Sequence, residues 1–292
     1  MPDSGYAHPE YLVETDWLAA HLADPKLVVL DCTVHLIPDP KITYVVKSGR
    51  EDFEKGHIPG AQFIDVQADL SDNGKLPLRF MLPTAAGFAA SMRRFGISDD
   101  SKVVTYSTAN PQWATRVWWV MRCFGFDAAV LNGGFQKWNR EGRAVETGAG
   151  KTRPAGNFTE RPAKPLMADK HDVLAAIDDG AVCTINALQA PQHAGTGGNT
   201  YGRPGRIKGS VNVPTVGLVD PATNTFLPAA QLRAQFDKVH AFDKKVITYC
   251  GGGIAASATA HALVMLGHPD VRLYDASMSE WAIDDSLPME TG

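Results

Sequence analysis

The amino-acid sequence predicts an α/β protein of two similar domains, each a mostly parallel sheet flanked by helices. Three observations lead to this prediction. The chain has 292 residues, about twice the usual length of one domain. Short apolar runs alternate with segments of helical length, which is the pattern of a parallel sheet covered by helices. The second half of the chain also repeats motifs of the first half in the same order.

Five short apolar runs are predicted to be buried strands, because they are rich in β-branched residues and too short for helices. They are residues 27–30, 102–106, 181–185, 246–249 and 271–274. Three segments have helical length and composition: 85–95, 113–124 and 255–266. In sheets of this kind the active site usually lies at the carboxyl ends of the strands.

Three pairs of matching segments define the internal repeat. Residues 56–61 match 205–210, residues 103–107 match 246–250, and residues 131–138 match 274–281. Their common order and nearly constant spacing indicate a duplicated domain. We therefore expect an N-terminal domain over residues 8–145 and a C-terminal domain over 166–290. Residues 146–165, rich in Gly, Pro, Lys and Arg, would be the linker.

The composition excludes several classes of protein. With 28 Lys+Arg against 32 Asp+Glu the net charge is −4, without the basic excess of a nucleic-acid-binding protein. Four widely spaced cysteines fit neither a disulfide framework nor a zinc module. No apolar run approaches the roughly 20 residues that span a bilayer, and residues 1–5 lack the features of a signal peptide. We expect a cytoplasmic protein that binds neither nucleic acid nor membranes.

Cys250 is the candidate catalytic nucleophile, because it ends a predicted strand and a glycine-rich turn separates it from a predicted helix. Such a turn can direct its N–H groups inward, and the helix start adds the positive end of a dipole. Both favour a thiolate and an anionic covalent adduct. The loop that would cradle this adduct comprises Gly251, Gly252, Gly253, Ile254 and Ala255. The other cysteines, Cys32, Cys123 and Cys183, are expected to be buried packing residues.

Two other interpretations of the Cys250 loop fit less well. Gly251-x-Gly253-x-x-Ala256 matches a dinucleotide-binding fingerprint, but too few residues follow Asp275 to complete that fold. A cysteine phosphatase needs an arginine six positions after the cysteine to grip phosphate. Ala256 stands there.

A set of motifs spread over nearly the whole chain carries a resemblance to a known family. The motifs are Gly56-His57-Ile58-Pro59-Gly60-Ala61, Met81-Leu82-Pro83, Arg116-Val117-Trp118-Trp119, Gly133-Gly134-Phe135-x-x-Trp138, Cys250-x-x-Gly253 and Tyr274-Asp275-x-Ser277-x-Ser279-Glu280-Trp281. In this order they resemble the tandem-domain rhodaneses, the thiosulfate and 3-mercaptopyruvate sulfurtransferases. The resemblance implies two rhodanese-like domains, of which the second is catalytic and the first a non-catalytic copy with Ser107 in place of Cys250.

The resemblance also implies a reaction. Cys250 would take a sulfur atom from a small anionic donor, thiosulfate or 3-mercaptopyruvate, and hold it as a persulfide. A thiol acceptor such as a thioredoxin-like protein, or cyanide, would then remove it. No metal or organic cofactor is implied.

The sequence departs from the family where the donor would bind. Thiosulfate-preferring members carry basic residues after the cysteine, so the uncharged Gly251 and Gly252 favour mercaptopyruvate. Many mercaptopyruvate-preferring members, however, have a serine at the position of Gly252. Relatives also carry two arginines where this chain has Leu188 and Gln192. These departures keep open an alternative, a rhodanese-like sulfur carrier or binding module with little turnover.

Four further residues are candidates for the site. Arg203 and Arg206 remain as possible partners for a carboxylate or sulfonate. His57 matches the histidine of a proton relay proposed for the mercaptopyruvate subgroup, so it is a candidate at the substrate. Asp275 is expected to support the loop by accepting hydrogen bonds from its N–H groups.

Overall fold

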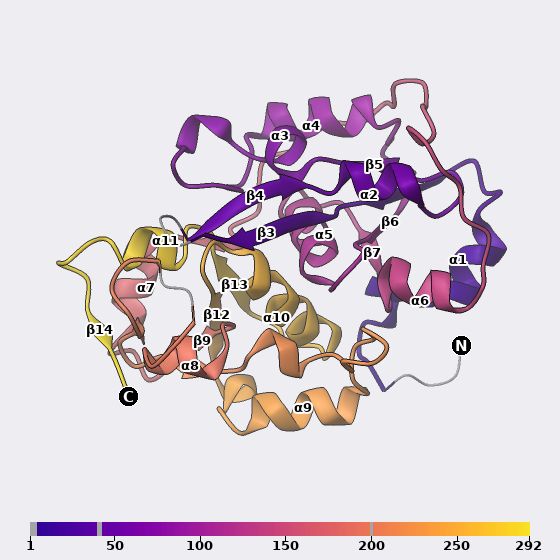
Figure 1. The fold of residues 1–292 in the computed structure, drawn as a ribbon. Coiled ribbons are helices and arrows are strands. Elements are labelled where there is room, and N and C mark those ends of the chain that lie inside the picture. The colour runs from indigo at the N-terminus through magenta and orange to yellow at the C-terminus, as the bar shows by residue number, and fades with distance from the viewer. Residues whose placement is uncertain (1–4, 40–42, 199–200) are drawn as a thin grey trace.

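Two parallel sheets form the centres of the two halves of the molecule (Figure 1). The structure is a computed structural model that describes residues 5–39, 43–198 and 201–292. The first sheet contains β1 (Leu12–Val13), β2 (Leu27–Asp31), β5 (Gln62–Phe63), β6 (Lys102–Tyr106) and β7 (Ala128–Leu131), in the order β1-β7-β6-β2-β5. The second contains β8 (Met167–Ala168), β9 (Val182–Asn186), β11 (Val211–Asn212), β12 (Lys245–Tyr249) and β13 (Val271–Tyr274), in the equivalent order β8-β13-β12-β9-β11. The shared order confirms the predicted duplication and α/β class.

Helices flank both sheets (Figure 1). The first half contains α1 (Thr15–His21), α2 (Arg50–Lys55), α3 (Val66–Leu70), α4 (Ala85–Arg94), α5 (Gln112–Cys123) and α6 (Gly134–Arg140). The second half contains α7 (Lys170–Ala176), α8 (Ala190–Ala194), α9 (Ala229–Asp237), α10 (Ile254–Met265) and α11 (Met278–Trp281). Short 3-10 helices are η1 (Pro9–Tyr11), η2 (Asn73–Lys75), η3 (Thr215–Gly217) and η4 (Ala241–Asp243). The five predicted strands and three predicted helices are confirmed, each to within one residue at either end.

Two antiparallel strand pairs lie outside the parallel sheets. One joins β10 (Arg206–Ile207) to β14 (Met289–Glu290) near the C-terminus. The other is a hairpin of β3 (Val34–Pro38) and β4 (Tyr44–Ser48), which extends from the first half towards the second (Figure 1). Sequence analysis did not predict the hairpin, which later forms one wall of the candidate site.

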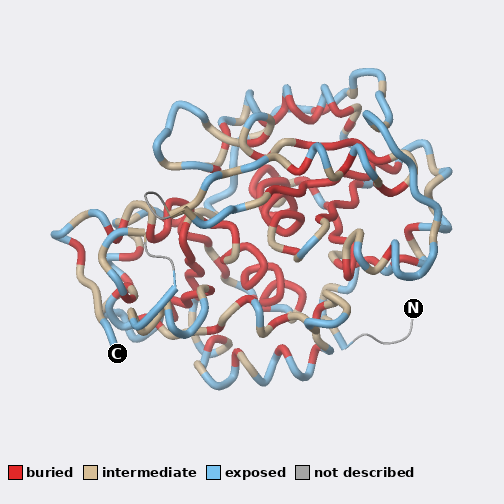
Figure 2. The backbone as a smooth tube through the Cα atoms, in the orientation of Figure 1, coloured by how far each residue is buried: buried red, intermediate tan, exposed pale blue. Residues whose placement is uncertain are grey.

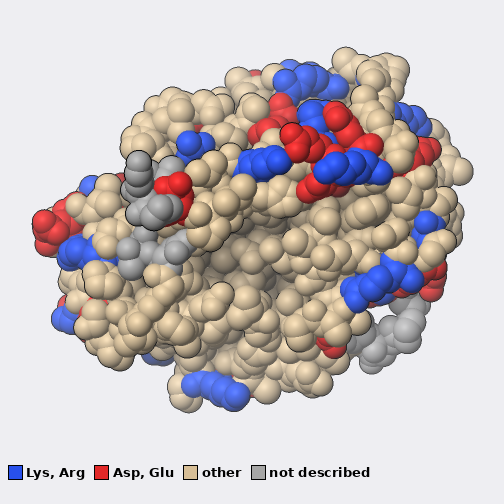
Figure 3. All heavy atoms as spheres, in the orientation of Figure 1, with Lys and Arg blue, Asp and Glu red and all other residues tan. Residues whose placement is uncertain are grey.

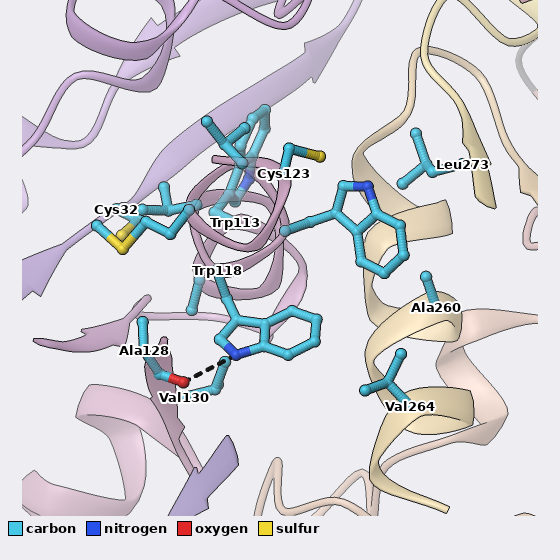
Figure 4. Packing of buried hydrophobic residues seen from close by; sticks show 14 of the residues in the cluster. Cys32, Trp113, Trp118, Cys123, Ala128, Val130, Ala260, Val264 and Leu273 are labelled. Carbon is cyan, nitrogen blue, oxygen red and sulfur yellow. Dashed lines mark hydrogen bonds between the residues drawn. The ribbon is translucent and has the colours of Figure 1, made fainter. Parts of the chain in front are cut away.

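Helices α5 and α10 pack against each other and join the two halves. The Thr115 and Ser257 hydroxyl oxygens lie 2.9 Å apart, and the Trp118 ring meets the edge of His261 at 4.4 Å between centroids. Both helices are buried along most of their length (Figure 2). Figure 4 shows side chains of both helices in one apolar cluster, with the Trp118 indole donating to the Ala128 carbonyl at 2.9 Å. The core is therefore continuous across the two halves.

The predicted linker, residues 146–165, packs along the first half. The Lys151 N–H donates to the Ala61 carbonyl at 3.1 Å, and the Gly156 N–H donates to the Arg93 carbonyl at 2.8 Å. Phe158 is buried within the first-half aromatic residues, 5.5 Å from Phe88 between ring centroids. The precise domain limits, 8–145 and 166–290, stay a prediction.

In the ranges described, no helix has both the length and the apolar character needed to cross a membrane. Residues 1–4, on which most of the signal-peptide argument rests, lie outside the described residues.

Candidate active site

A cavity of about 600 Å³ lies between the two halves, and Cys250 borders it. The first half contributes the β3–β4 hairpin, residues 77–80 and Gln112. The second half contributes the start of α8, part of η3 and the loop between β12 and α10. Figure 3 shows the corresponding face hollowed below the hairpin, with mostly uncharged atoms around the hollow. Cys250 follows β12 directly and is only 2% exposed, so the reactive group would be screened from bulk water.

The loop after Cys250 is held by its carbonyl oxygens. The Met278 N–H donates to the Cys250 carbonyl at 3.1 Å, and the Ser279 N–H donates to the Gly251 carbonyl at 2.8 Å. The Cys250 N–H donates to the Ser277 hydroxyl oxygen at 3.1 Å. Within the described residues, the N–H groups of Gly251, Gly252 and Gly253 have no protein acceptor. Together with the start of the 12-residue helix α10, they can stabilise an anion on the neighbouring sulfur.

Neighbouring atoms approach two of the three glycines closely. A Cβ on Gly251 would lie 1.8 Å from Cζ of Tyr201. Gly253 has φ +77°, and its Cβ would lie 2.7 Å from the Asp275 carbonyl oxygen. A Cβ on Gly252 would meet its nearest neighbour, the Ser279 hydroxyl, at 3.6 Å, which is ordinary contact. The absence of a serine at position 252 is therefore not forced by lack of space.

Two tyrosines that sequence analysis missed border the cavity beside this loop. Tyr201 packs over Gly251, and its ring centroid lies 6.0 Å from that of Tyr44 in the hairpin. Burial, and then the nearby Cys250 thiol, raises the pKa of Tyr201 well above its ordinary value. Its phenol is consequently a neutral hydrogen-bond donor at physiological pH. Neither tyrosine belongs to a repeated motif, so only their three-dimensional placement identifies them.

Asp275 binds the first half rather than the loop N–H groups, which corrects the sequence-based expectation. Its Oδ1 accepts from Nη2 of Arg116 at 2.6 Å, and its Oδ2 accepts from the Leu82 N–H at 2.7 Å. Arg116 is fully buried on α5 and also donates to the Phe80 carbonyl. Because the Asp275 backbone packs beneath Gly253, this ion pair connects the loop after Cys250 with the first half.

Arg203 and Arg206 lie outside the cavity. The Arg203 guanidinium donates to the carbonyls of Trp281 and Leu287 at 3.1 and 3.0 Å. Arg206 lies 3.4 Å from a carboxylate oxygen of Glu290. Both side chains thus hold the C-terminal segment in place, and the structure does not bring them to Cys250.

His57 also lies away from Cys250. It is completely buried in the first half, where its ring stacks on Phe53 at 3.9 Å. Its Nδ1 lies 2.8 Å from the Phe53 carbonyl oxygen, and its Nε2 lies 4.0 Å from Glu146. The hollow beside His57 shares no residue with the cavity at Cys250. These contacts give His57 a packing role in the first half.

Leu188 and Gln192, at which the resemblance implied arginines, do lie on the cavity. Leu188 and Gln192 line it from the second half, and both are uncharged. Arg79 lines it from the first half. Sequence analysis missed Arg79, although it stands only two residues before the Met81-Leu82-Pro83 motif.

At the corresponding place in the first half, the described residues enclose only a small hollow. Ser107, the counterpart of Cys250, donates its hydroxyl hydrogen to the Asn110 carbonyl. The hollow beside it measures about 10 Å³, and a Cβ on Gly134 would lie 2.3 Å from the Ser107 carbonyl oxygen. This space is about that of a single water molecule. At the Ser107 site, the described residues therefore offer neither a thiol in place of Cys250 nor room for a substrate.

The other three cysteines behave as packing residues. Cys32, Cys123 and Cys183 are all buried. Burial raises the pKa of Cys123 to about 12 and that of Cys183 to about 11, and it also raises the pKa of Cys32. Their thiols stay protonated at neutral pH and are poor nucleophiles. In the part of the chain that the structure covers, no group of three His, Cys, Asp or Glu side chains could hold a metal ion.

Comparison with known proteins supports the family suggested by the motifs. The rhodanese-like domain family matches residues 14–141 and 169–284. The 3-mercaptopyruvate sulfurtransferase of Escherichia coli K12 is 34% identical, with 96% of this chain aligned to 98% of that protein. The sulfur carrier protein TtuD of Thermus thermophilus is 33% identical over 99% of both chains. The thiosulfate sulfurtransferase of Bos taurus is 32% identical over 92% of this chain and 91% of that protein.

A solved structure agrees with these relationships. The crystal structure of SseA, a 3-mercaptopyruvate sulfurtransferase from Escherichia coli, superposes with a TM-score of 0.80 at 32% identity, covering 92% of this chain and 99% of that one. The fold and the matched segments define a protein with two rhodanese domains in tandem. The chain belongs to the rhodanese-like family, and its relatives over the full length include 3-mercaptopyruvate and thiosulfate sulfurtransferases.

Proposed function

We propose that this protein is a sulfurtransferase that holds a transferred sulfur atom as a persulfide on Cys250. The main support is the position of the Cys250 thiol, which borders the interdomain cavity next to three glycines whose N–H groups have no acceptor among the described residues. A persulfide is a small anion when deprotonated, so these N–H groups and the start of α10 match its charge. The sulfurtransferases among the relatives support the same reaction class.

The reaction has two displacement steps. In the first, the Cys250 thiolate attacks the outer sulfur of the donor and an S–S bond forms. With 3-mercaptopyruvate the C–S bond breaks, its electron pair stays on carbon, and protonation of the resulting enolate gives pyruvate. With thiosulfate the departing group is sulfite. In the second step an acceptor thiolate attacks the outer sulfur of the persulfide, and Cys250 leaves as a thiolate.

Tyr201 has the position and protonation state to assist the first step. Its neutral phenol borders the cavity beside the cysteine loop and can donate a hydrogen bond to an oxygen or sulfur of the donor. No metal or organic cofactor enters the proposed reaction. The proposed acceptor is a thiol, such as that of a thioredoxin-like protein, or cyanide.

Mass spectrometry of the intact protein tests the role of Cys250. After incubation with 3-mercaptopyruvate or thiosulfate, the native protein should gain one sulfur atom. The Cys250→Ala variant should gain none, whereas Cys183→Ala, which removes a buried thiol of the same domain, should still gain one. Sulfur addition to Cys250→Ala would show that the assignment is wrong.

A sulfur carrier with little turnover is the second candidate function. It is favoured by the uncharged Leu188 and Gln192 on the cavity wall and by the relationship to the sulfur carrier protein TtuD. A carrier would accept sulfur on Cys250 but stop consuming donor after one equivalent when only small acceptors are present. Sustained pyruvate or sulfite release with cyanide or a small thiol would exclude this candidate.

A further inference from the structure

We propose that Arg79 of the non-catalytic first half binds the carboxylate of the sulfur donor, and that the protein therefore prefers a small thiol bearing one carboxylate. This inference rests on the proposed function of Cys250 and names the donor class and a specificity-determining residue for it. The reacting sulfur would be bound by the second half and the anionic end of the donor by the first.

The charge distribution of the cavity supports this assignment. Among the described residues that line it, Arg79 is the only one that is an arginine, lysine, histidine, aspartate or glutamate. Its side chain is exposed, and no described residue forms an ion pair or hydrogen bond with its guanidinium. An arginine free of protein partners can form two parallel hydrogen bonds to a carboxylate.

The backbone that presents Arg79 is held in place. The next residue, Phe80, has φ +60°, a conformation that costs a non-glycine residue roughly 1–2 kcal/mol and persists only when neighbouring contacts impose it. The Phe80 N–H donates to the Gln67 side chain at 3.2 Å, and its carbonyl accepts from Arg116. Its ring packs edge-on against Trp113, 5.0 Å away between centroids. The Arg79 side chain therefore starts from a fixed backbone position at the rim of the cavity.

The same segment is connected with the catalytic loop. Two residues beyond Phe80, the Leu82 N–H donates to Asp275 at 2.7 Å, and the Asp275 backbone supports Gly253. The side chain that would bind the donor and the loop that would hold its sulfur therefore share one buried connection. Because the distance between Arg79 and the loop after Cys250 is then constrained, a short donor that binds both would be held with its sulfur near Cys250.

The second-half wall of the cavity offers no positive charge among its described residues, so a cation from the first half would have to balance the charge of the donor. Two second-half residues that line the cavity, Leu188 and Gln192, are uncharged, and the guanidinium of Arg203 is engaged by backbone carbonyls elsewhere. A single positive charge balances one carboxylate. A compact dianion such as thiosulfate would leave one charge unbalanced among largely apolar walls, which is unfavourable.

A pair of matched donors tests the assignment. Mercaptoacetone has the same reacting sulfur and carbonyl group as 3-mercaptopyruvate but lacks the carboxylate. We expect the native protein to prefer 3-mercaptopyruvate by about 10- to 100-fold in kcat/KM, the range of a hydrogen-bonded charge pair. Arg79→Ala should remove this preference, mainly by raising KM for 3-mercaptopyruvate. It should change kcat/KM for mercaptoacetone less than about threefold.

Two further variants complete the experiment. Arg79→Lys keeps the charge and should restore part of the preference. Lys75→Ala removes an exposed positive charge four residues away, outside the cavity, and should leave the preference unchanged. An equal loss for both donors in Arg79→Ala, or no loss for 3-mercaptopyruvate, would overturn the inference. So would a native kcat/KM that is higher for thiosulfate than for 3-mercaptopyruvate. If no donor adds sulfur to Cys250 of the native protein, the proposed function itself fails, whatever the effect of Arg79.

Discussion

The glycines after Cys250 differ in how much space their neighbours leave for a side chain. Gly251 lies under the ring of Tyr201, whereas Gly252 has ordinary van der Waals space above it. The Cys-Gly-Gly-Gly sequence alone gives no means of telling these two positions apart. Only the path of the chain before β10, which carries Tyr201 onto the loop, makes the first of them sensitive to a methyl group.

We predict different costs for alanine at the two positions. Gly251→Ala should destabilise the protein by about 1–3 kcal/mol, as overpacking does, because the Tyr201 ring must move. Gly252→Ala, the matched control, should change the unfolding free energy by less than about 0.5 kcal/mol. Urea unfolding measures both. In a Tyr201→Ala background the cost of Gly251→Ala should largely disappear, and an unchanged cost there would contradict this explanation.

Helix α10 places an ionisable side chain, His261, against helix α5 at the interface between the halves. His261 is completely buried on α10, with its Nε2 3.1 Å from the Tyr11 carbonyl oxygen. Its Nδ1 has no partner among the residues described. Burial lowers the pKa of His261 from 6.5 to about 3, so the folded protein holds this ring neutral.

The pKa of His261 predicts a loss of stability in mild acid. Because the unfolded chain binds a proton below about pH 6.5 and the folded state does not, the unfolding free energy falls as the pH decreases towards 3. The loss is about 1.4 kcal/mol per pH unit, or about 2 kcal/mol between pH 6.5 and 5. His261→Gln should lack this contribution.

The measurement compares the native protein with His261→Gln by urea unfolding at pH 7.5 and pH 5.0. Asp31, whose pKa burial raises to about 6, contributes with the opposite sign between about pH 4 and 6. It is present in both proteins, so its effect cancels in the comparison. An identical pH dependence of the two proteins would show that His261 is not the titrating group.

The sequence predicted most of the central strands of the two sheets but missed others. One of these is the fully buried β7 (Ala128–Leu131), which begins with two alanines, a residue that is depleted in strands. The strands β2, β6, β9, β12 and β13 read as continuous apolar runs because helices cover both faces of a parallel sheet. The β3–β4 hairpin has mixed burial, with Leu36, Ile37 and Val45 exposed, so its composition carries no clear period. Cys250 was identifiable because its loop motif is local. The walls opposite it come from the other half, and no pattern along the chain encodes how the halves are placed.

At the scale of the whole molecule, one buried ion pair connects the halves beneath the loop after Cys250. Arg116 and Asp275 are 1% and 8% exposed at their side chains. Removing one partner of such a pair leaves a buried charge without compensation.

We therefore predict that Asp275→Ala costs about 3–5 kcal/mol of unfolding free energy. Asp285→Ala is the matched control, because Asp285 also faces an arginine, Arg203, at 3.5 Å, but is 94% exposed. Its removal should cost less than about 1 kcal/mol. Thermal and urea unfolding of the two variants give the comparison, and equal costs would mean that the buried pair contributes no more than a surface pair.

The filled hollow at Ser107 has a consequence for how such a protein can change over time. The first copy, which has neither a thiol nor room for a substrate beside Ser107, would carry out no sulfur chemistry of its own under the proposed function. It now forms one wall of the cavity in the other copy. Under the proposed function, mutations in the hairpin or in residues 77–80 would alter which donor enters without altering the bonds made and broken at Cys250. In such a protein the choice of donor and the chemistry at Cys250 would depend on different copies of the domain, so each could change without the other.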